Sequence, residues 1–214
     1  MFAGWFENAG ELGAGLLVTL KVVLVASVIT LVWASLVAWA RLGRNRMLRW
    51  LAIAYIEIFR STPILVQIFA IFTVLPAIGL KLPPFESAIA ALVLNAGGYL
   101  TENVRSAFGA IPLGLLEVAD ALGMKPMTKL RRVIIPQSLK VLIPVCANTL
   151  LFILLTTPFI FLVGLQDIMM KANAIQRRTG DYSVFLEVTI VFVVISLAIH
   201  FIATRLEKRL ASHF

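Results

Sequence analysis

Long apolar runs separated by polar stretches dominate the sequence, and they limit what it can fold into. About 20 predominantly apolar residues in a helix cross the hydrocarbon core of a bilayer. Five runs reach that length, at about residues 16–40, 50–75, 87–108, 141–164 and 184–204. Hydrophobic residues make up 60% of the chain and charged residues 14%, against roughly 45–50% and 25% in soluble domains. The sequence therefore predicts a single all-α integral membrane domain over residues 1–214, with about five transmembrane helices.

The Lys and Arg residues predict the orientation of these helices. The nine residues from Arg41 to Arg49 hold four arginines. Thirteen Lys and Arg residues lie on the same side of the predicted bundle as this loop and four on the other, with Lys21 and Arg60 set aside because they lie within predicted spans. Because loops rich in Lys and Arg stay in the cytoplasm, we expect the N-terminus outside and the C-terminus inside.

The remaining composition excludes several classes of function. The formal charge of +8 comes from loops between apolar runs, so we expect no nucleic-acid partner. Cys146 has no second cysteine, and His200 and His213 have no neighbouring ligands, so we expect no disulfide and no metal site. Cys146 and His200 are expected to pack inside the bundle. The chain has no Gly-rich phosphate loop and no nucleophile motif, so we expect neither an enzyme nor a cofactor held by the chain itself.

The longest polar interruption, at about residues 109–140, is patterned as a short helix with a defined end. Pro112 suits the first turn of a helix, and Glu117 and Asp120 lie in its N-terminal half, where the helix dipole favours acids. Gly123 is expected to end the helix in a left-handed cap, and Pro126 discourages its continuation. One face is expected to be apolar, and it comprises Leu116, Ala119, Leu122 and Gly123. Such a helix docks in a groove of a partner protein or lies on the lipid surface.

This loop resembles the "EAA" loop of permeases from binding-protein-dependent ABC importers. The family pattern runs Glu-Ala-Ala, three residues, Gly, nine residues and Ile-x-Leu-Pro; Glu117, Ala119, Gly123 and residues 133–136 meet its spacing in full. The departures are conservative, and they are Val118, Val133 and Ile135. The resemblance implies a coupling helix that sits in a cleft of a cytoplasmic ATPase subunit. The residues expected at that contact are Glu117, Ala119, Asp120, Leu122, Gly123 and Met124.

The second apolar run resembles a signature of the polar amino-acid branch of these permeases, usually Tyr-x-Glu-x-x-Arg-Gly-Thr-Pro-x-x-x-Gln. Ser61 replaces the Gly, and the matching residues are Tyr55, Glu57, Arg60, Thr62, Pro63 and Gln67. Charged groups at membrane depth are unfavourable unless paired. We therefore expect Glu57 and Arg60, three residues apart on one helix, to form a mutual salt bridge near the cytoplasmic interface rather than to contact substrate.

The two motifs together imply the transmembrane subunit of a type I importer in the bacterial inner membrane. The resemblance implies a second permease subunit, identical or paralogous, and two ATPase subunits that bind ATP and Mg. It also implies a periplasmic substrate-binding protein. The implied substrates are polar or basic amino acids, or related compounds such as opines.

Polar residues on the third and fourth apolar runs are candidates for lining a substrate path. On the third run they are Asn95, Tyr99 and Glu102, which lie mostly on one helical face. On the fourth run they are Asn148, Thr156 and Thr157. A polar stripe on a membrane helix lines either a helix contact or an aqueous path, and both remain open here. Many relatives carry Lys-Asp/Glu-Thr-Ser where this chain has Leu-Thr-Thr-Pro at 155–158. The change predicts either the non-binding half of a heterodimer or a less strongly charged substrate.

Two other classes of function fit the apolar pattern. An ion-coupled secondary amino-acid carrier would work without an ATPase and would need buried acids such as Glu187. A membrane scaffold for a signalling ATPase would have no substrate path. Replacing Gly123 with a bulky residue separates these hypotheses, because an importer should lose ATPase association or coupling whereas a carrier should be nearly indifferent.

Overall fold

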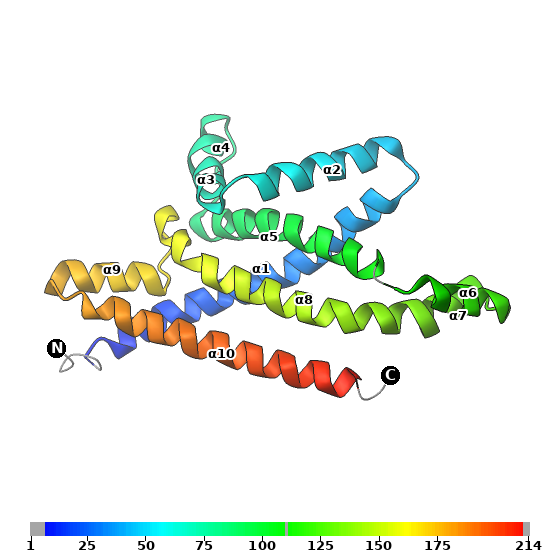
Figure 1. Ribbon diagram of the computed structural model, residues 1–214. Helices are drawn as coiled ribbons and strands as arrows, with labels where there is room; N and C mark the ends of the chain where they lie inside the picture. Colours follow the sequence, from blue (N-terminus) through cyan, green and yellow to red (C-terminus); the bar gives the residue numbers. More distant parts are fainter. Residues whose placement is uncertain (1–6, 110, 212–214) are drawn as a thin grey trace.

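The computed structural model describes residues 7–109 and 111–211, and within these ranges the regular elements are all helical, as predicted (Figure 1). In chain order they are α1 (Ala9–Leu42), α2 (Arg46–Ser61), α3 (Ile64–Phe69), η1 (Ala70–Val74), α4 (Leu75–Ala77), α5 (Pro84–Gly109), α6 (Leu113–Ala121), α7 (Pro126–Lys129), η2 (Leu130–Ile134), α8 (Ile135–Thr156), η3 (Thr157–Val163), α9 (Ile168–Thr179) and α10 (Ser183–Ala211). The elements η1 and η2 are π-helical turns within longer helical stretches, and η3 is a 3₁₀ helix.

Three stretches of the described chain are long and apolar enough to cross a membrane: Ala9–Leu42, Val141–Val163 and Ser183–Lys208. The helix α2 and the stretch Ile64–Ala77 make a fourth if this bent pair counts as one span. The third predicted span corresponds to α5, whose 26 residues are long enough to cross at ~1.5 Å per residue. Its polar residues lower its hydropathy, so it is not among the three stretches above. The helices therefore follow the predicted runs, while the number of five spans stays a prediction.

The second predicted span is not one continuous helix. The helix α2 ends at Ser61, and the helical stretch that begins at Ile64 turns away from it by 109°. The cause is Pro63, which has no N–H to donate to the Phe59 carbonyl and which disfavours helical geometry at Thr62. Thr62 is accordingly extended, with φ −112° and ψ 138°. The second predicted span thus comprises two helical stretches that meet at a bend, and the polar residues of this run gather at that corner.

The central helix is α5, which packs against α1, α2, α3 and α8. Small residues allow the close approach, and Ala91 and Ala96 on α5 are fully buried. At Gly97, a Cβ atom would lie 2.7 Å from both Trp33 Cδ1 and the Tyr55 hydroxyl oxygen. Small residues of this kind let membrane helices pack closely in the absence of a hydrophobic driving force. The packing fixes the direction in which the polar residues of α5 point.

The helix α9 lies in the stretch predicted as a loop after the fourth span, and it packs on α1. Asp167 caps it, with Oδ1 accepting from the Met170 N–H at 2.9 Å, and Gly180 ends it at φ +72°. Gly15 of α1 permits the contact, because a Cβ atom there would lie 2.8 Å from the Asp167 carbonyl oxygen and from Ile168 Cα. The Asp cap and the Gly stop are signals that could have predicted this helix.

The loops predicted to be cytoplasmic share one end of the molecule. The turn between α1 and α2, the helices α6 and α7, and the C-terminal end of α10 lie at this end (Figure 1). The N-terminal end of α1 and the helix α9 lie at the opposite end. The direction in which the bundle crosses the membrane stays a prediction.

Candidate functional site

The helix α6 ends in a tight cap built on Gly123. This residue has φ +65°, and its N–H donates to the Asp120 carbonyl at 2.9 Å. The Met124 N–H donates to the Ala119 carbonyl at 3.1 Å. These two bonds around a left-handed glycine define a Schellman motif. The predicted left-handed stop at Gly123 is confirmed, and a new helix, α7, begins at Pro126.

An ion pair ties α6 to α7, and we call these two helices the α6–α7 hairpin. Both carboxylate oxygens of Asp120 lie 2.7 Å from the Lys129 ammonium nitrogen. An exposed pair contributes ~0.2–1 kcal/mol, which favours one arrangement of two short helices that project beyond the bundle (Figure 1). The hairpin is therefore a defined protrusion rather than an unstructured loop.

The exposed apolar stripe of α6 differs from the predicted one. Ala119 has 1% of its surface exposed, whereas Val118 has 57% and Leu122 has 69%. Leu115, also exposed, lies three residues before Val118 and seven before Leu122, so these three share one helical face. Of the residues predicted on the apolar face, Ala119 is buried against its own protein and Leu116 is half-buried, because α6 turns that side toward the protein. Only Leu122 belongs to both the predicted and the observed apolar face.

The segment after α6 adds positive charge to this protrusion. A cleft of about 520 Å³ is lined by Met127, Thr128, Arg131 and Arg132. On α6 itself Glu117 is exposed, and Met124 is half-buried after the cap. The α6–α7 hairpin and the η2 turn after it thus present apolar and basic groups together, which suits a groove with an apolar floor and acidic groups at its edge.

Side-chain amides hold the corner between α2 and α3. Because Pro63 leaves the Phe59 carbonyl without its helical donor, Gln67 Nε2 and Asn95 Nδ2 each donate to that oxygen at 3.0 Å. Gln67 Nε2 also lies 2.7 Å from Thr62 Oγ1. The signature residues Thr62, Pro63 and Gln67 therefore build and stabilise this corner, a role that their spacing alone did not reveal.

The predicted salt bridge between Glu57 and Arg60 is wrong. It is not among the ion pairs of the described residues. The Arg60 guanidinium instead lies 5.4 Å from the centroid of the Tyr99 ring, a favourable cation–π arrangement. The Tyr99 hydroxyl in turn donates to the Arg60 carbonyl at 3.0 Å. Glu57 is exposed.

Glu102 continues the polar face of α5 and joins two helices. Its carboxylate pairs with Arg41 of α1, and it accepts from Arg105 Nε at 2.8 Å. Charge-assisted bonds from two guanidinium groups satisfy most of the acceptor capacity of a carboxylate. Within this chain, Asn95, Tyr99 and Glu102 therefore all serve helix contacts.

Two of the six predicted path residues border one cleft. Tyr99 and Asn148 lie around a space of about 280 Å³ between α5 and α8, whose other lining residues are Ala96, Asn103, Thr149 and Phe152. Thr156 and Thr157 lie elsewhere and are buried, and their hydroxyls donate to carbonyls in the last turns of α8 at 2.8 and 2.7 Å. Asn103 is a lining residue that the prediction missed, although it lies four residues after Tyr99 and so next to it on the surface of α5.

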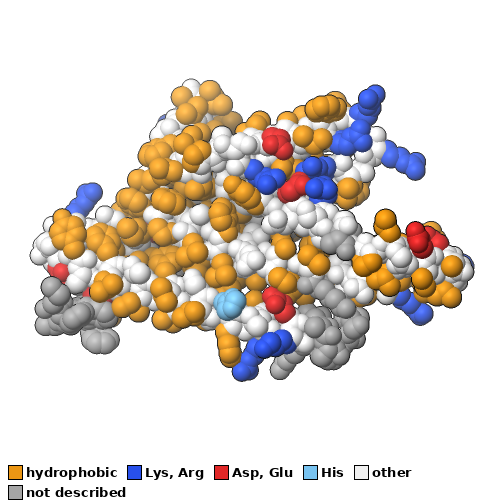
Figure 2. Space-filling model, in the orientation of Figure 1, with side chains coloured by type: hydrophobic (Ala, Val, Ile, Leu, Met, Phe, Trp, Pro, Cys, Tyr) orange, Lys and Arg blue, Asp and Glu red, His pale blue; other side chains and the backbone are white. Residues whose placement is uncertain are grey.

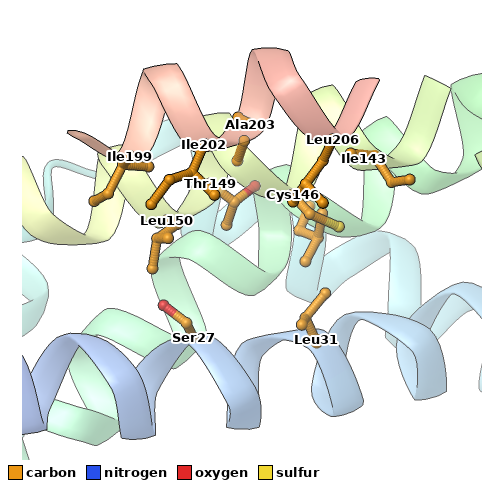
Figure 3. Close-up of a pocket in the computed structure, with 12 residues that line it drawn as sticks. Ser27, Leu31, Ile143, Cys146, Thr149, Leu150, Ile199, Ile202, Ala203 and Leu206 are labelled. Carbon is orange, nitrogen blue, oxygen red and sulfur yellow. The ribbon is translucent and has the colours of Figure 1, made fainter. Parts of the chain in front are cut away.

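A second cavity, of about 340 Å³, lies between α1, α5, α8 and α10 and is apolar (Figure 3). Leu31, Ile143 and Leu150 face it, with the Ser27 hydroxyl and the Cys146 thiol as small polar groups. A charged or dipolar solute would lose its hydrogen bonds with water there without replacement. This cavity is therefore a poor candidate for a polar substrate.

The described residues contain no group of three or more His, Cys, Asp or Glu side chains that could hold a metal ion. Cys146 is half-buried at the edge of the apolar cavity. His200 was predicted to pack inside the bundle, but it lies on an exposed face of α10. This helix contacts its neighbours through its other side. His213 lies outside the described residues.

The sequence and the fold both resemble those of known proteins. A family model described as binding-protein-dependent transport system inner membrane component matches residues 30–212. The L-cystine transport system permease protein TcyB of Bacillus subtilis (strain 168) is 32% identical over 206 residues, which cover 94% of this chain and 88% of that protein. The arginine transport system permease protein ArtQ of the same organism is 29% identical, over 93% of this chain and 92% of its own length. A solved structure described as an amino acid ABC transporter with histidines superposes with a TM-score of 0.92 and 27% identity, over 98% of both chains.

Proposed function

This chain belongs to the family of binding-protein-dependent transport system inner membrane components, and on that premise we propose that α6 couples it to an ATPase and that the cleft between α5 and α8 admits the substrate. The chain is the permease subunit of an ABC importer of the inner membrane and is not an enzyme. Its relatives are ATP-driven importers, which favours this function over that of an ion-coupled carrier.

One observation carries the coupling proposal. The Schellman cap at Gly123 and the Asp120–Lys129 pair hold α6 in one position, with Val118 and Leu122 exposed on it. A rigid helix with an exposed apolar stripe loses little conformational entropy when it enters a groove. We propose that this groove lies on a cytoplasmic ATPase subunit and that Glu117, Ala119, Asp120, Leu122, Gly123 and Met124 form the predicted contact. Ala119 would contribute indirectly, because its small side chain lets α6 pack closely against the rest of this chain.

The remaining partners follow from the importer architecture. We propose two ATPase subunits, which bind ATP and Mg, and a second permease subunit that is either a copy of this chain or a paralogue. A periplasmic binding protein would deliver the substrate at the end that carries α9. No cofactor is assigned to the chain itself.

For the substrate we propose a polar or basic amino acid or a related compound such as an opine. Two similar permeases are named for cystine and for arginine, so similar chains serve both dipolar and cationic solutes. In this chain the cleft presents the Tyr99 ring, Asn103 and Asn148, which supply an aromatic face and two amides but no carboxylate. These groups suit the uncharged part of an amino acid, and Glu102, one residue from Asn103, is the nearest acid along α5.

Uptake by proteoliposomes tests the function. The vesicles hold this chain with the ATPase subunits that co-purify with it, and the binding protein is added at the opposite face. We expect uptake of a labelled polar amino acid only when MgATP is supplied on the ATPase side. Uptake driven by a sodium or proton gradient without nucleotide would contradict the proposal. Asn148→Leu should lower uptake while leaving the amount of bound ATPase subunit unchanged.

A further inference from the structure

The turn between α1 and α2 carries positive charge that the described part of the chain does not balance. Arg41 pairs with Glu102, but Arg44, Arg46 and Arg49 have no acidic partner within residues 7–109 and 111–211. All three side chains are exposed. Figure 2 shows Lys and Arg side chains gathered at the end of the molecule where α1 turns into α2. We call Arg44, Arg46 and Arg49 the arginine turn.

The backbone at this turn already has its hydrogen-bond partners. Asn45 Oδ1 accepts from the Met47 and Leu48 N–H groups at 2.9 and 3.3 Å, which caps the start of α2. The groups left to bind an external anion are therefore the guanidinium groups rather than the helix terminus. Each guanidinium can form two parallel hydrogen bonds with a phosphate group.

An apolar cleft opens between the same two helices. It has a volume of about 330 Å³ and is lined by Trp33, Leu36, Val37, Ala40, Leu48, Leu51, Ala52 and Tyr55. The helices meet through a small cluster of Val37, Ala52 and Ile56 that is separate from the main core. Leu36 and Leu51 are more than half exposed, so the cleft is accessible from outside the bundle.

Two tryptophans indicate where this helix pair meets the membrane surface. Trp39 on α1 is 70% exposed, and Trp50 on α2 is 67% exposed. They flank the arginine turn on its two sides along the chain. Because exposed Trp residues concentrate at the boundary between hydrocarbon and headgroups, the arginine turn is placed at the level of lipid phosphates. The cleft lies further along the helices, at the level of acyl chains.

We propose that the cleft between α1 and α2 binds an anionic phospholipid of the leaflet that faces the arginine turn. One acyl chain occupies the apolar cleft, and the phosphate is held by Arg44, Arg46 and Arg49. A zwitterionic lipid would bring its own cation among three guanidinium groups, so a lipid with net negative charge is preferred. The lipid would also brace α2 against α1, next to the corner that holds α5.

A polypeptide segment suits this cleft less well than an acyl chain. A peptide would need partners for its backbone N–H and C=O groups at membrane depth. The cleft offers few, since the Tyr55 hydroxyl already donates to the Leu94 carbonyl at 2.7 Å. An acyl chain has no such groups to satisfy.

The test measures how many lipids the protein immobilises. The full chain is reconstituted in phosphatidylcholine vesicles with a trace of spin-labelled phosphatidylglycerol or of spin-labelled phosphatidylcholine, and electron paramagnetic resonance reports the restricted fraction of each. We expect phosphatidylglycerol to be preferred. Arg46→Gln should lower the preference about fivefold, and Arg46→Lys should retain most of it. Arg177→Gln, at the exposed end of α9, is the charge-matched control and should have no effect.

A second variant tests the cleft without changing any charge. Ala40→Phe fills part of the lining, and it should lower the restricted fraction of phosphatidylglycerol while a folded protein is confirmed by circular dichroism. Equal restriction of the two lipids by the unaltered chain, or equal effects of Arg46→Gln and Arg177→Gln, would overturn the proposal. A restricted fraction unchanged by Ala40→Phe would also overturn it. Efficient cross-linking of Leu51→Cys between two copies of the chain would overturn it as well, because the occupant of the cleft would then be a second copy.

Discussion

The Asn95 side-chain amide donates to the Phe59 carbonyl oxygen at 3.0 Å and so joins the middle of α5 to the corner between α2 and α3. The carbonyl is available because the residue that would bond to it in a continuous helix is Pro63. The helix α5 ends at Gly109 and the α6–α7 hairpin begins at Leu113. In the proposed coupling, a displacement of α6 would be transmitted to this corner along α5.

Removing the amide at Asn95 should destabilise the corner. Asn95→Leu should lower the free energy of unfolding by about 1 kcal/mol, and the double variant with Gln67→Leu should lower it by roughly 1–3 kcal/mol more, because the buried carbonyl then has no donor. The measurement is the thermal unfolding midpoint in detergent. Asn173→Leu is the control, since the Asn173 amide donates to the Met169 carbonyl within its own helix. Equal losses at positions 95 and 173 would contradict the assigned role.

The contact between α1 and α9 should depend on the absence of a side chain at Gly15. A Cβ atom there would lie 2.8 Å from backbone atoms of α9 and its cap, whereas a Cβ atom at Gly13, two residues away on the same helix, meets nothing within 4 Å. We expect Gly15→Ala to destabilise the protein by about 1–3 kcal/mol and Gly13→Ala to have little effect. Limited proteolysis of the segment after η3 reports the loss of packing. Identical digestion of the two variants would rule out this contact as the cause.

Asp167 should make stability depend on pH. Burial raises its pKa to about 6, although the N–H groups at the start of α9 oppose this by lowering it, and its Oδ2 has no hydrogen-bond partner among the described residues. Because the folded-state pKa exceeds the unfolded one, the contribution to stability is complete below about pH 4 and is lost as pH rises through about 6. We expect Asp167→Asn, which keeps a capping side chain, to remove this dependence and to stabilise the protein at pH 8 by ~2–3 kcal/mol. An unchanged profile of unfolding midpoint against pH would contradict the prediction.

Glycine and proline positions in the sequence predicted features that depend on a single helix, such as where it ends. Gly123 ends α6 because only a residue without a Cβ atom adopts its φ without strain, and that can be read from spacing. Contacts between helices could not be predicted from residue spacing along the chain. Whether Arg60 pairs with Glu57 or lies over the Tyr99 ring depends on where α5 packs. Whether Ala119 is buried depends on how α6 packs against the rest of the protein. The bend at Pro63 was visible in principle, but the apolar run around it concealed the corner.

The cap of α6 should matter for coupling more than for folding. Gly123→Ala places a Cβ atom on a residue with left-handed backbone geometry, which costs about 1–2 kcal/mol of stability. Gly114 lies on the same helix without a positive φ, and a Cβ atom there meets nothing within 4 Å, so Gly114→Ala should be neutral or stabilising. We expect Gly123→Ala to reduce ATP-dependent uptake severalfold with normal membrane insertion. The ratio of transported substrate to hydrolysed ATP is the measurement. A loss of uptake in Gly114→Ala as large as in Gly123→Ala would point to general disruption of α6 instead.

Photo-cross-linking from position 122 in the assembled transporter tests the account most directly. A benzophenone amino acid replaces Leu122, which is exposed at the end of α6, or Leu80, which is exposed on the turn before α5. The account predicts a cross-link from position 122 to an ATPase subunit and none from position 80. A cross-link to ATPase from position 80, or none from position 122 in a complex that still hydrolyses ATP, would contradict it.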